Sequence, residues 1–232
     1  MMDMQYVYAA GQNNGRITQS IDGVANETVN YTYDALNRLA SANATNGIWG
    51  QGFTYDGFGN LTQKVVTQGA APTLSVAFDP ATNRQAGIPY DSNGNMAVYG
   101  SAYDGENRLL ASYVGGYPWN YEYDPQGRRV LKTNASSGNQ GEMYFYGIGG
   151  QKLATYQCAT NGNWSCGSPA YSLYFGGKLI IAKGVAVATD RLGSVRANAG
   201  GDRMTYYPYG DEKTSTLDGR EKFGTYMRDG FG

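Results

Sequence analysis

Aromatic residues spaced two apart, each pair followed by a polar turn, recur along the chain. In Tyr31-Thr-Tyr33-Asp34 the two tyrosines point to the same face of a β-strand, because successive side chains alternate between faces. The same order of aromatic, any residue, aromatic and Asp returns at residues 53–56 and 121–124. Residues 88–91 carry Ile in the first place, and 103–104 lack the first aromatic. The pattern predicts a series of strand–turn–strand units.

The residues after each pair indicate a tight hairpin turn. Asp accepts hydrogen bonds from the backbone two residues on, and the fourth turn position holds Gly or Asn, which tolerate positive φ best. A type I turn followed by such a left-handed residue is a common hairpin connection, closed by a G1 bulge. The predicted turn pairs are Asp34 with Asn37, Asp56 with Gly59, Asp91 with Gly94, Asp104 with Asn107, Asp124 with Gly127, and Asp190 with Gly193.

The spacing of the turns predicts an all-β chain with almost no helix. Intervals between turn Asp residues are 22 and 23 residues, then 12 and 13, then 20, and Asp79 opens a copy with one extra turn residue. No segment sustains a period near 3.6. The tyrosines directly before the turns are expected on one sheet face, packed against neighbouring repeats: Tyr33, Tyr55, Tyr90, Tyr103 and Tyr123. After residue 141 the repeat is expected to loosen.

The pattern resembles the tyrosine-aspartate (YD) repeat of Rhs proteins, which also occurs in teneurins and in the C component of Tc toxin complexes. A second stretch strengthens the resemblance: Asp190-Arg-Leu-Gly193-Ser-Val-Arg196, Tyr206-Tyr-Pro-Tyr-Gly210 and Phe223-Gly-Thr-Tyr226 are similar to the end of the Rhs core. The resemblance implies antiparallel hairpins in a curved segment of a spiral β-shell. We expect a hairpin array over residues 1–150 and the terminal part of the core over 151–232, in one continuous sheet.

The resemblance also implies a function and partners. Such shells enclose or present a C-terminal toxin or effector, so the expected partners are the rest of an Rhs-like chain and its cargo, in a secreted or cell-surface parent protein. The Asp-containing DPxGL-like cleavage motif of the family is absent from this sequence. The chain is therefore not expected to cleave itself. Its end at Arg228-Asp-Gly-Phe-Gly232, just before the family's next stretch would begin, favours a fragment or a degenerate short member, which we expect to self-associate through exposed strand edges.

Composition excludes several other classes. The 232 residues carry a net charge of −1, with 16% charged residues and no basic run, which argues against nucleic-acid binding. No apolar run is long enough for a membrane span, and the first residues do not form a signal peptide. With 21 Tyr and 34 Gly, the composition favours strands and turns.

Few residues offer catalytic chemistry. The chain has no His, which removes His bases, triads and ligands, so we expect no enzyme, metal site or cofactor. The repeat Asp residues are interpreted as turn caps. Cys158 and Cys166 flank the turn signal Asn161-Gly-Asn163 and are either a disulfide or two unpaired thiols. Arg191 and Arg196 are interpreted as a surface pair.

The sequence leaves one functional alternative open. Trp49, Trp119 and Trp164 are placed in loops or at strand starts, where exposed aromatics would stack on sugars. A cell-surface carbohydrate-binding module, with surface glycans as partners, is thus the alternative to a structural shell segment. Packing between strands is the favoured interpretation of these side chains.

Overall fold

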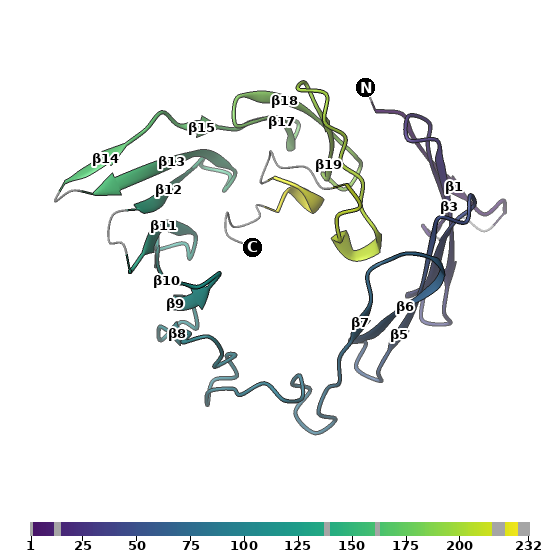
Figure 1. Cartoon of the computed structure of the whole chain (residues 1–232), viewed down its shortest axis with the longest axis horizontal. Coiled ribbons are helices and arrows are strands. Elements are labelled where there is room, and N and C mark those ends of the chain that lie inside the picture. Colours follow the sequence, from purple (N-terminus) through teal and green to yellow (C-terminus); the bar gives the residue numbers. More distant parts are fainter. Residues whose placement is uncertain (1, 12–14, 137–139, 161–162, 215–220, 227–232) are drawn as a thin grey trace. The chain divides into compact units, whose positions relative to one another are not determined.

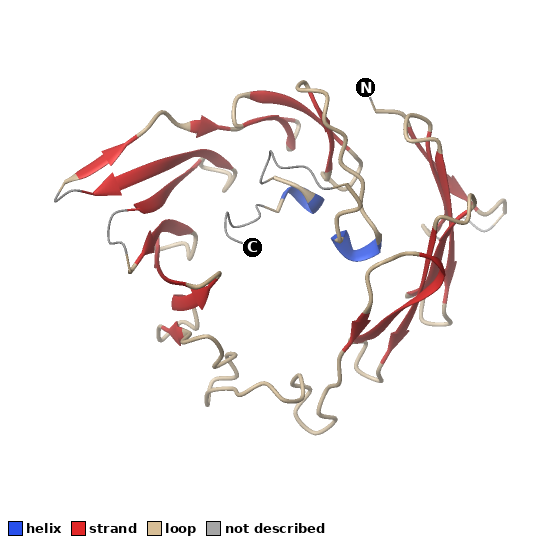
Figure 2. Cartoon of the chain, viewed as in Figure 1, coloured by secondary structure: helices blue, strands red, loops and turns tan. Residues whose placement is uncertain are grey.

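The computed structural model describes residues 2–11, 15–136, 140–160, 163–214 and 221–226. Regular structure within these ranges is antiparallel strand, apart from two short 3-10 segments, η1 (Pro208–Gly210) and η2 (Phe223–Thr225) (Figure 2). The predicted all-β class is confirmed. No helix among the described residues is long and apolar enough to cross a membrane.

The chain divides into two compact units. Unit 1 contains Met1–Gly87 together with Arg203–Ser215, and unit 2 contains Ile88–Asp202 together with Thr216–Gly232. A segment late in the sequence therefore belongs to the unit formed by the first repeats. The segment Arg203–Ser215 thus separates the two parts of unit 2 in the sequence.

Unit 1 is built on a seven-stranded sheet in which sequence neighbours pair in order (Figure 1). Its strands are β1 (Met4–Tyr8), β2 (Ile17–Asp22), β3 (Glu27–Tyr33), β4 (Leu39–Ala44), β5 (Trp49–Tyr55), β6 (Leu61–Gly69) and β7 (Leu74–Ser75). The core on one face contains Val29, Ala42, Ala44, Trp49 and Phe53. Phe53 is buried while Thr54 beside it is exposed, as the two-residue alternation of a strand requires.

Unit 2 contains two sheets. The first follows the order β14-β13-β12-β11-β10-β9-β8, with β15 also paired to β13, and the second the order β16-β17-β18-β19. The strands of the first are β8 (Ala102–Tyr103), β9 (Leu109–Val114), β10 (Tyr117–Tyr123), β11 (Arg129–Asn134), β12 (Gln140–Tyr146), β13 (Lys152–Thr160), β14 (Trp164–Cys166) and β15 (Ala170–Tyr171). Those of the second are β16 (Leu173–Phe175), β17 (Lys178–Ala182), β18 (Val185–Thr189) and β19 (Val195–Asn198).

The described strands form three sheets, and the chain passes from unit 1 to unit 2 between Gly87 and Ile88. The break lies where the turn Asp residues are only 12 and 13 apart. A turn occupies five of those positions, which leaves too few residues for paired strands. Single bridges, Phe78 with Gln85 and Tyr90 with Met96, stand there in place of strands.

Candidate functional site

The repeat turns share one hydrogen-bond pattern. In the first of them the Asp34 amide donates to the Arg38 carbonyl (2.9 Å) and the Asn37 amide donates to the Asp34 carbonyl (3.0 Å). Asp34 Oδ1 accepts the amides of Leu36 and Arg38, both at 2.9 Å. The turns that open at Asp56, Asp91, Asp104, Asp124 and Asp190 repeat these four bonds.

The fourth turn residue has positive φ in every one of these turns. The angles are 64° at Asn37, 89° at Gly59, 90° at Gly94, 61° at Asn107, 75° at Gly127 and 84° at Gly193. The strand register slips beside five of these six turns, all except the one at Asp91, for example between Thr32 and Tyr33 and between Thr54 and Tyr55. This is the conformation that the sequence predicts from Gly and Asn at these positions.

In five of the six turns, all except the one at Asp190, the fifth residue donates to the second oxygen of the Asp side chain. Arg38, Arg108 and Arg128 donate from Nε to Asp34, Asp104 and Asp124 at 2.7, 2.7 and 2.6 Å. Asn60 and Asn95 donate from Nδ2 to Asp56 and Asp91 at 2.8 and 2.9 Å. The sequence alone does not indicate a partner for this fifth residue.

These bonds hold the carboxylates in the ionised form. The Asn60 side chain, helped by the amides of Asn60 and Phe58, lowers the pKa of Asp56 below its ordinary value despite partial burial. At Asp104 the strongest influence that lowers the pKa is the Arg108 amide, which outweighs burial. A carboxylate that the fold keeps ionised acts as a hydrogen-bond acceptor for the turn and is poorly suited to donate a proton.

Each turn Arg also contacts the next repeat. The guanidinium carbon of Arg38 lies 4.6 Å from the ring centroid of Tyr55, the tyrosine before the following turn. The same relation joins Arg108 to Tyr123 (5.3 Å) and Arg128 to Tyr146 (5.0 Å), and the Arg16 guanidinium lies 5.7 Å from the Tyr33 ring centroid. The salt bridge to Asp fixes the Arg side chain, so the cation is presented to the ring in a defined position.

The hydroxyl of that tyrosine completes the contact. It donates to the carbonyl of the residue that follows the preceding turn: Tyr33 to Ile17 (2.8 Å), Tyr55 to Leu39 (2.7 Å), Tyr103 to Met96 (3.0 Å), Tyr123 to Leu109 (2.8 Å) and Tyr146 to Arg129 (2.8 Å). We call the Asp–Arg–Tyr set, with its tyrosine hydroxyl bond, the repeat lock. It joins one hairpin to the next through side chains, in addition to the strand ladder.

The same turn recurs where the sequence lacks Asp. Gly147 and Asn198 open turns with the two backbone bonds of the repeat, closed at Gln151 and Asp202. In the second of these the roles are exchanged, since Asn198 Nδ2 donates to Asp202 Oδ2 at 2.9 Å. The turn of the repeat thus recurs beyond residue 141 in units whose sequence departs from the aromatic–Asp pattern. The available sequence signal was glycine at positions 150 and 201, where φ is positive.

A further turn of this kind, at Tyr207–Asp211, lies in a segment that packs on the unit 1 sheet. We call residues 203–214 the clasp. The Tyr207 and Trp49 rings form a T-shaped pair with centroids 5.1 Å apart, and the Tyr209 and Phe53 ring centroids are 5.4 Å apart. Two ion pairs join Asp211 to Lys64 and Lys213 to Glu27. The sequence singled out Tyr206–Gly210 but gave no sign of where it packs.

Unit 2 has a comparable cover of its own. Glu221, which is 5% exposed, pairs with Lys152 at 3.4 Å. The Lys222 carbonyl accepts the Val195 amide at 3.0 Å, and the Gly224 amide donates to Ser194 Oγ at 3.0 Å. Lys222 and Gly224 therefore pack against the turn that Asp190 opens.

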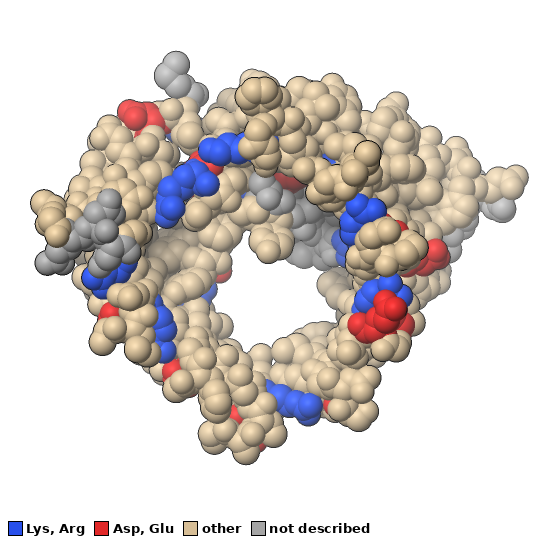
Figure 3. All heavy atoms as spheres, turned by 180° about the vertical axis from the view of Figure 1, so that it is seen from behind, with Lys and Arg blue, Asp and Glu red and all other residues tan. Residues whose placement is uncertain are grey.

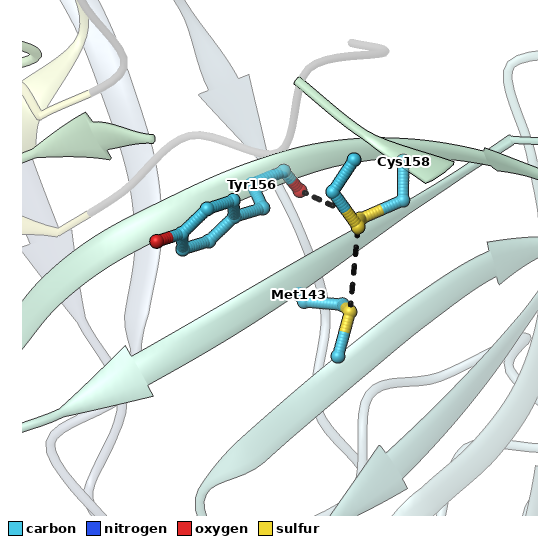
Figure 4. Close-up of a disulfide and its surroundings, with 4 residues drawn as sticks. Met143, Tyr156 and Cys158 are labelled. Atoms are coloured by element: carbon cyan, nitrogen blue, oxygen red, sulfur yellow. Dashed lines mark hydrogen bonds between the residues drawn. A yellow bond between two sulfur atoms is a disulfide. The ribbon is translucent and has the colours of Figure 1, made fainter. Parts of the chain in front are cut away.

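Cys158 and Cys166 form a disulfide between β13 and β14, where the two residues are register partners (Figure 4). Cys158 Sγ lies 3.9 Å from the Tyr156 carbonyl oxygen, and Cys166 Sγ lies 3.8 Å from Met143 Sδ. Residues 161–162 of the connecting turn lie outside the described residues. The bond fastens the edge strand β14 to the sheet.

The tryptophans are not arranged as a sugar-stacking surface. Trp49 and Trp119 are each 2% exposed, and Trp49 Nε1 donates to Glu27 at 2.8 Å. Only Trp164, at 47%, is exposed. The stacking interpretation is therefore wrong for Trp49 and Trp119, because strand alternation points both side chains into the packed face.

The charged side chains of the described residues differ in burial. The described residues contain no group of three His, Cys, Asp or Glu that could hold a metal ion. Arg191 is exposed and Arg196 half-buried, so the two differ in environment. On the face seen in Figure 3, Lys and Arg side chains are scattered, several of them beside Asp or Glu.

Comparisons with known proteins agree with this geometry. The profile of the teneurin YD-shell family matches residues 2–203. Among solved structures, the Tc holotoxin pore of Photorhabdus luminescens is similar, with a TM-score of 0.56 and 15% identity. The match covers 98% of this chain and 16% of the pore chain, so the fold is shared over a small part of the larger protein. No curated protein sequence matches.

Proposed function

Because the chain belongs to the teneurin YD-shell family, we propose that it is a structural segment of a β-shell wall in a secreted or cell-surface protein. The wall encloses or presents a toxin or effector that is part of the same longer polypeptide. The partners are thus the neighbouring repeats and that cargo. The chain spans only 16% of the similar Tc pore chain, so the cargo and the export of the whole protein are part of the proposal.

The repeat lock is the observation that carries this function. A wall must hold each hairpin to the next along its whole length, and the lock does this with the same atoms in both units. Arg38 with Tyr55 provides it in unit 1, and Arg128 with Tyr146 provides it in unit 2. Because the Asp, Arg and Tyr side chains of the lock make contacts between repeats, the arrangement favours a scaffold over a catalyst.

The carbohydrate-binding alternative is not supported. Two of its three tryptophans are buried, and the family profile is that of a shell. We assign no catalytic role to the chain. Its carboxylates cap turns, and it has no His to act as a base near neutral pH.

Protease protection of the longer parent protein tests the shell function. The polypeptide that follows the shell should be digested at least about tenfold more slowly in the intact protein than when it is expressed alone, since a closed wall excludes the protease. The paired substitution Arg108→Ala and Tyr123→Ala should remove much of that protection. Tyr113→Ala, at a half-exposed tyrosine outside the lock, is the matched control. Equal digestion rates in the intact and isolated forms would contradict the proposal.

A further inference from the structure

The clasp is a self-contained hairpin. Its Tyr207 amide donates to the Asp211 carbonyl at 2.8 Å, and its Gly210 amide donates to the Tyr207 carbonyl at 3.1 Å. The Lys213 amide donates to the Thr205 carbonyl at 2.9 Å, and a bridge joins Tyr206 to Glu212. These backbone bonds connect the clasp to itself and not to the sheet beneath it, and a lone two-stranded hairpin of this kind is only marginally stable in water once it is released.

The clasp meets the sheet through side chains. Tyr207 and Tyr209 rest on Trp49 and Phe53, the two large apolar residues of β5. The Tyr207 hydroxyl donates to the Ala70 carbonyl at 3.3 Å, and the Tyr55 and Tyr209 hydroxyls are hydrogen-bonded to each other. Burial is the main cause that raises the pKa of Tyr55, and the hydrogen bond with Tyr209 is the second. The Tyr55 hydroxyl therefore stays protonated throughout the physiological pH range.

Two ion pairs of opposite polarity set the direction of the clasp. The sheet offers a cation, Lys64, to Asp211 of the clasp and an anion, Glu27, to Lys213. Docking in the reverse direction would place like charges together. The Lys213 ammonium also lies 5.1 Å from the Trp49 ring centroid, where the ring face attracts a cation.

Lys64 of the unit 1 sheet has its carboxylate partner on the clasp and not on a neighbouring strand. Across the strands, Lys64 faces Phe53 on β5 and Leu74 on β7, neither of which carries a charge. Lys132 lies at the same distance after Asp124 in unit 2 as Lys64 lies after Asp56 in unit 1. Lys132, however, faces Glu142 of its own sheet. Lys64 is 8% exposed, and its carboxylate partner comes from the clasp.

The clasp also holds an unusual backbone conformation. Tyr209 has a φ of 67°, a region that bulky residues rarely adopt, yet its side chain remains 51% exposed. Such strain persists where surrounding contacts enforce it and often marks a functional position. Here the contacts are the Phe53 ring and the Tyr55 hydroxyl.

We propose that Glu27, Trp49, Phe53, Tyr55 and Lys64 form a peptide-binding site whose ligand is the clasp, and that the clasp leaves and re-enters this site while the sheet stays folded. The ligand class is a turn peptide in which two aromatic residues, an acidic residue and a lysine follow one another at every second position, as Tyr207, Tyr209, Asp211 and Lys213 do. Docking rests on contacts within unit 1 alone and does not depend on the proposed shell role.

The direct test replaces residues 203–214 of the full chain with a Gly-Ser linker of the same length and adds the clasp as a fluorescently labelled peptide. Fluorescence anisotropy should show saturable binding. The Asp211→Lys peptide should bind about tenfold more weakly or worse, because it places two cations together in a partly buried site. It should regain affinity for a chain that carries Lys64→Asp. A folded linker chain that binds no peptide, or equal affinity for both peptides, would overturn the proposal.

Hydrogen exchange of the unaltered chain tests the same proposal even if the linker chain does not fold. The amides of Gly210 and Lys213 should exchange at least about tenfold faster than paired amides of β5 and β6, since local opening needs less free energy than global unfolding. Asp211→Lys should speed clasp exchange further and leave β5 unchanged. Exchange of clasp and strands at one common rate would show that the clasp cannot leave separately.

Discussion

Tyr123 donates its hydroxyl hydrogen to the Leu109 carbonyl oxygen, 2.8 Å away and 14 residues earlier in the chain. Leu109 directly follows the turn that opens at Asp104, and Arg108 of that turn lies over the Tyr123 ring. One tyrosine thereby contacts both a side chain and the backbone of the preceding repeat. The tyrosine of the repeat therefore holds neighbouring hairpins in register.

Removing this hydroxyl should destabilise unit 2. We expect Tyr123→Phe to lower the free energy of unfolding by about 1 kcal/mol, because a partly buried carbonyl loses its donor while the ring still packs. Tyr113→Phe, at a tyrosine that is 50% exposed, should change it by less than about 0.5 kcal/mol. Urea unfolding measures both, and equal effects would show that the hydroxyl bond adds nothing.

Gly59 should tolerate only residues that accept positive φ. A Cβ there meets nothing within 4 Å, so the cost of substitution comes from φ +89° alone. Gly59→Val should cost about 1–3 kcal/mol, whereas Gly59→Asn should cost less, as Asn37 and Asn107 occupy the same place. Gly57→Val is the control, because Gly57 is equally open and lacks positive φ. A loss at Gly57 as large as that at Gly59 would refute the backbone explanation.

Stability should fall in acid. The folded-state pKa of Asp56 is lowered, mainly by Asn60, so the folded state binds fewer protons than the unfolded state in this range. The contribution is full above the ordinary value of 3.8 and is lost as the pH falls through the lower folded value. Asp56→Asn should flatten this acid dependence and keep the turn, since Asn198 already opens one. Thermal unfolding from pH 7 to pH 2 measures it, and an unchanged slope would contradict this assignment.

The disulfide should stabilise unit 2 locally. Its short loop, with a sequence separation of 8, predicts a loss of about 2–3 kcal/mol for Cys158→Ser with Cys166→Ser, mainly through the entropy of the unfolded chain. Hydrogen exchange should show reduced protection at the β13–β14 pair Ala159–Ser165, with β5 and β6 of unit 1 unaffected. Unchanged protection in β13 would show that the bond is dispensable.

The local rules of the hairpin were readable from the sequence. Paired aromatics, Asp and a Gly or Asn three residues later predicted the turns, because each depends on residues within one turn. Turns without Asp, such as the one at Gly147, were missed because the backbone bonds need only one residue with positive φ, here Gly150.

The clasp and the repeat lock were not predictable in this way. Asp211 and Lys64 are 147 positions apart, and neither local sequence indicates the other. The pairing of Arg128 with Tyr146 depends on how two hairpins stack, which strand periodicity does not specify. The short intervals between turn Asp residues are visible in the sequence. That the units separate there was not predicted, because it depends on how many residues remain to form paired strands.

A double-mutant cycle on Arg128 and Tyr146 tests the central claim, that the repeat lock joins one hairpin to the next. The free energies of unfolding are measured for the parent chain, Arg128→Met, Tyr146→Leu and the double variant. The 5.0 Å contact predicts a coupling of about 0.5–1 kcal/mol beyond the sum of the single effects. Strictly additive single effects, with a coupling near zero, would contradict the claim.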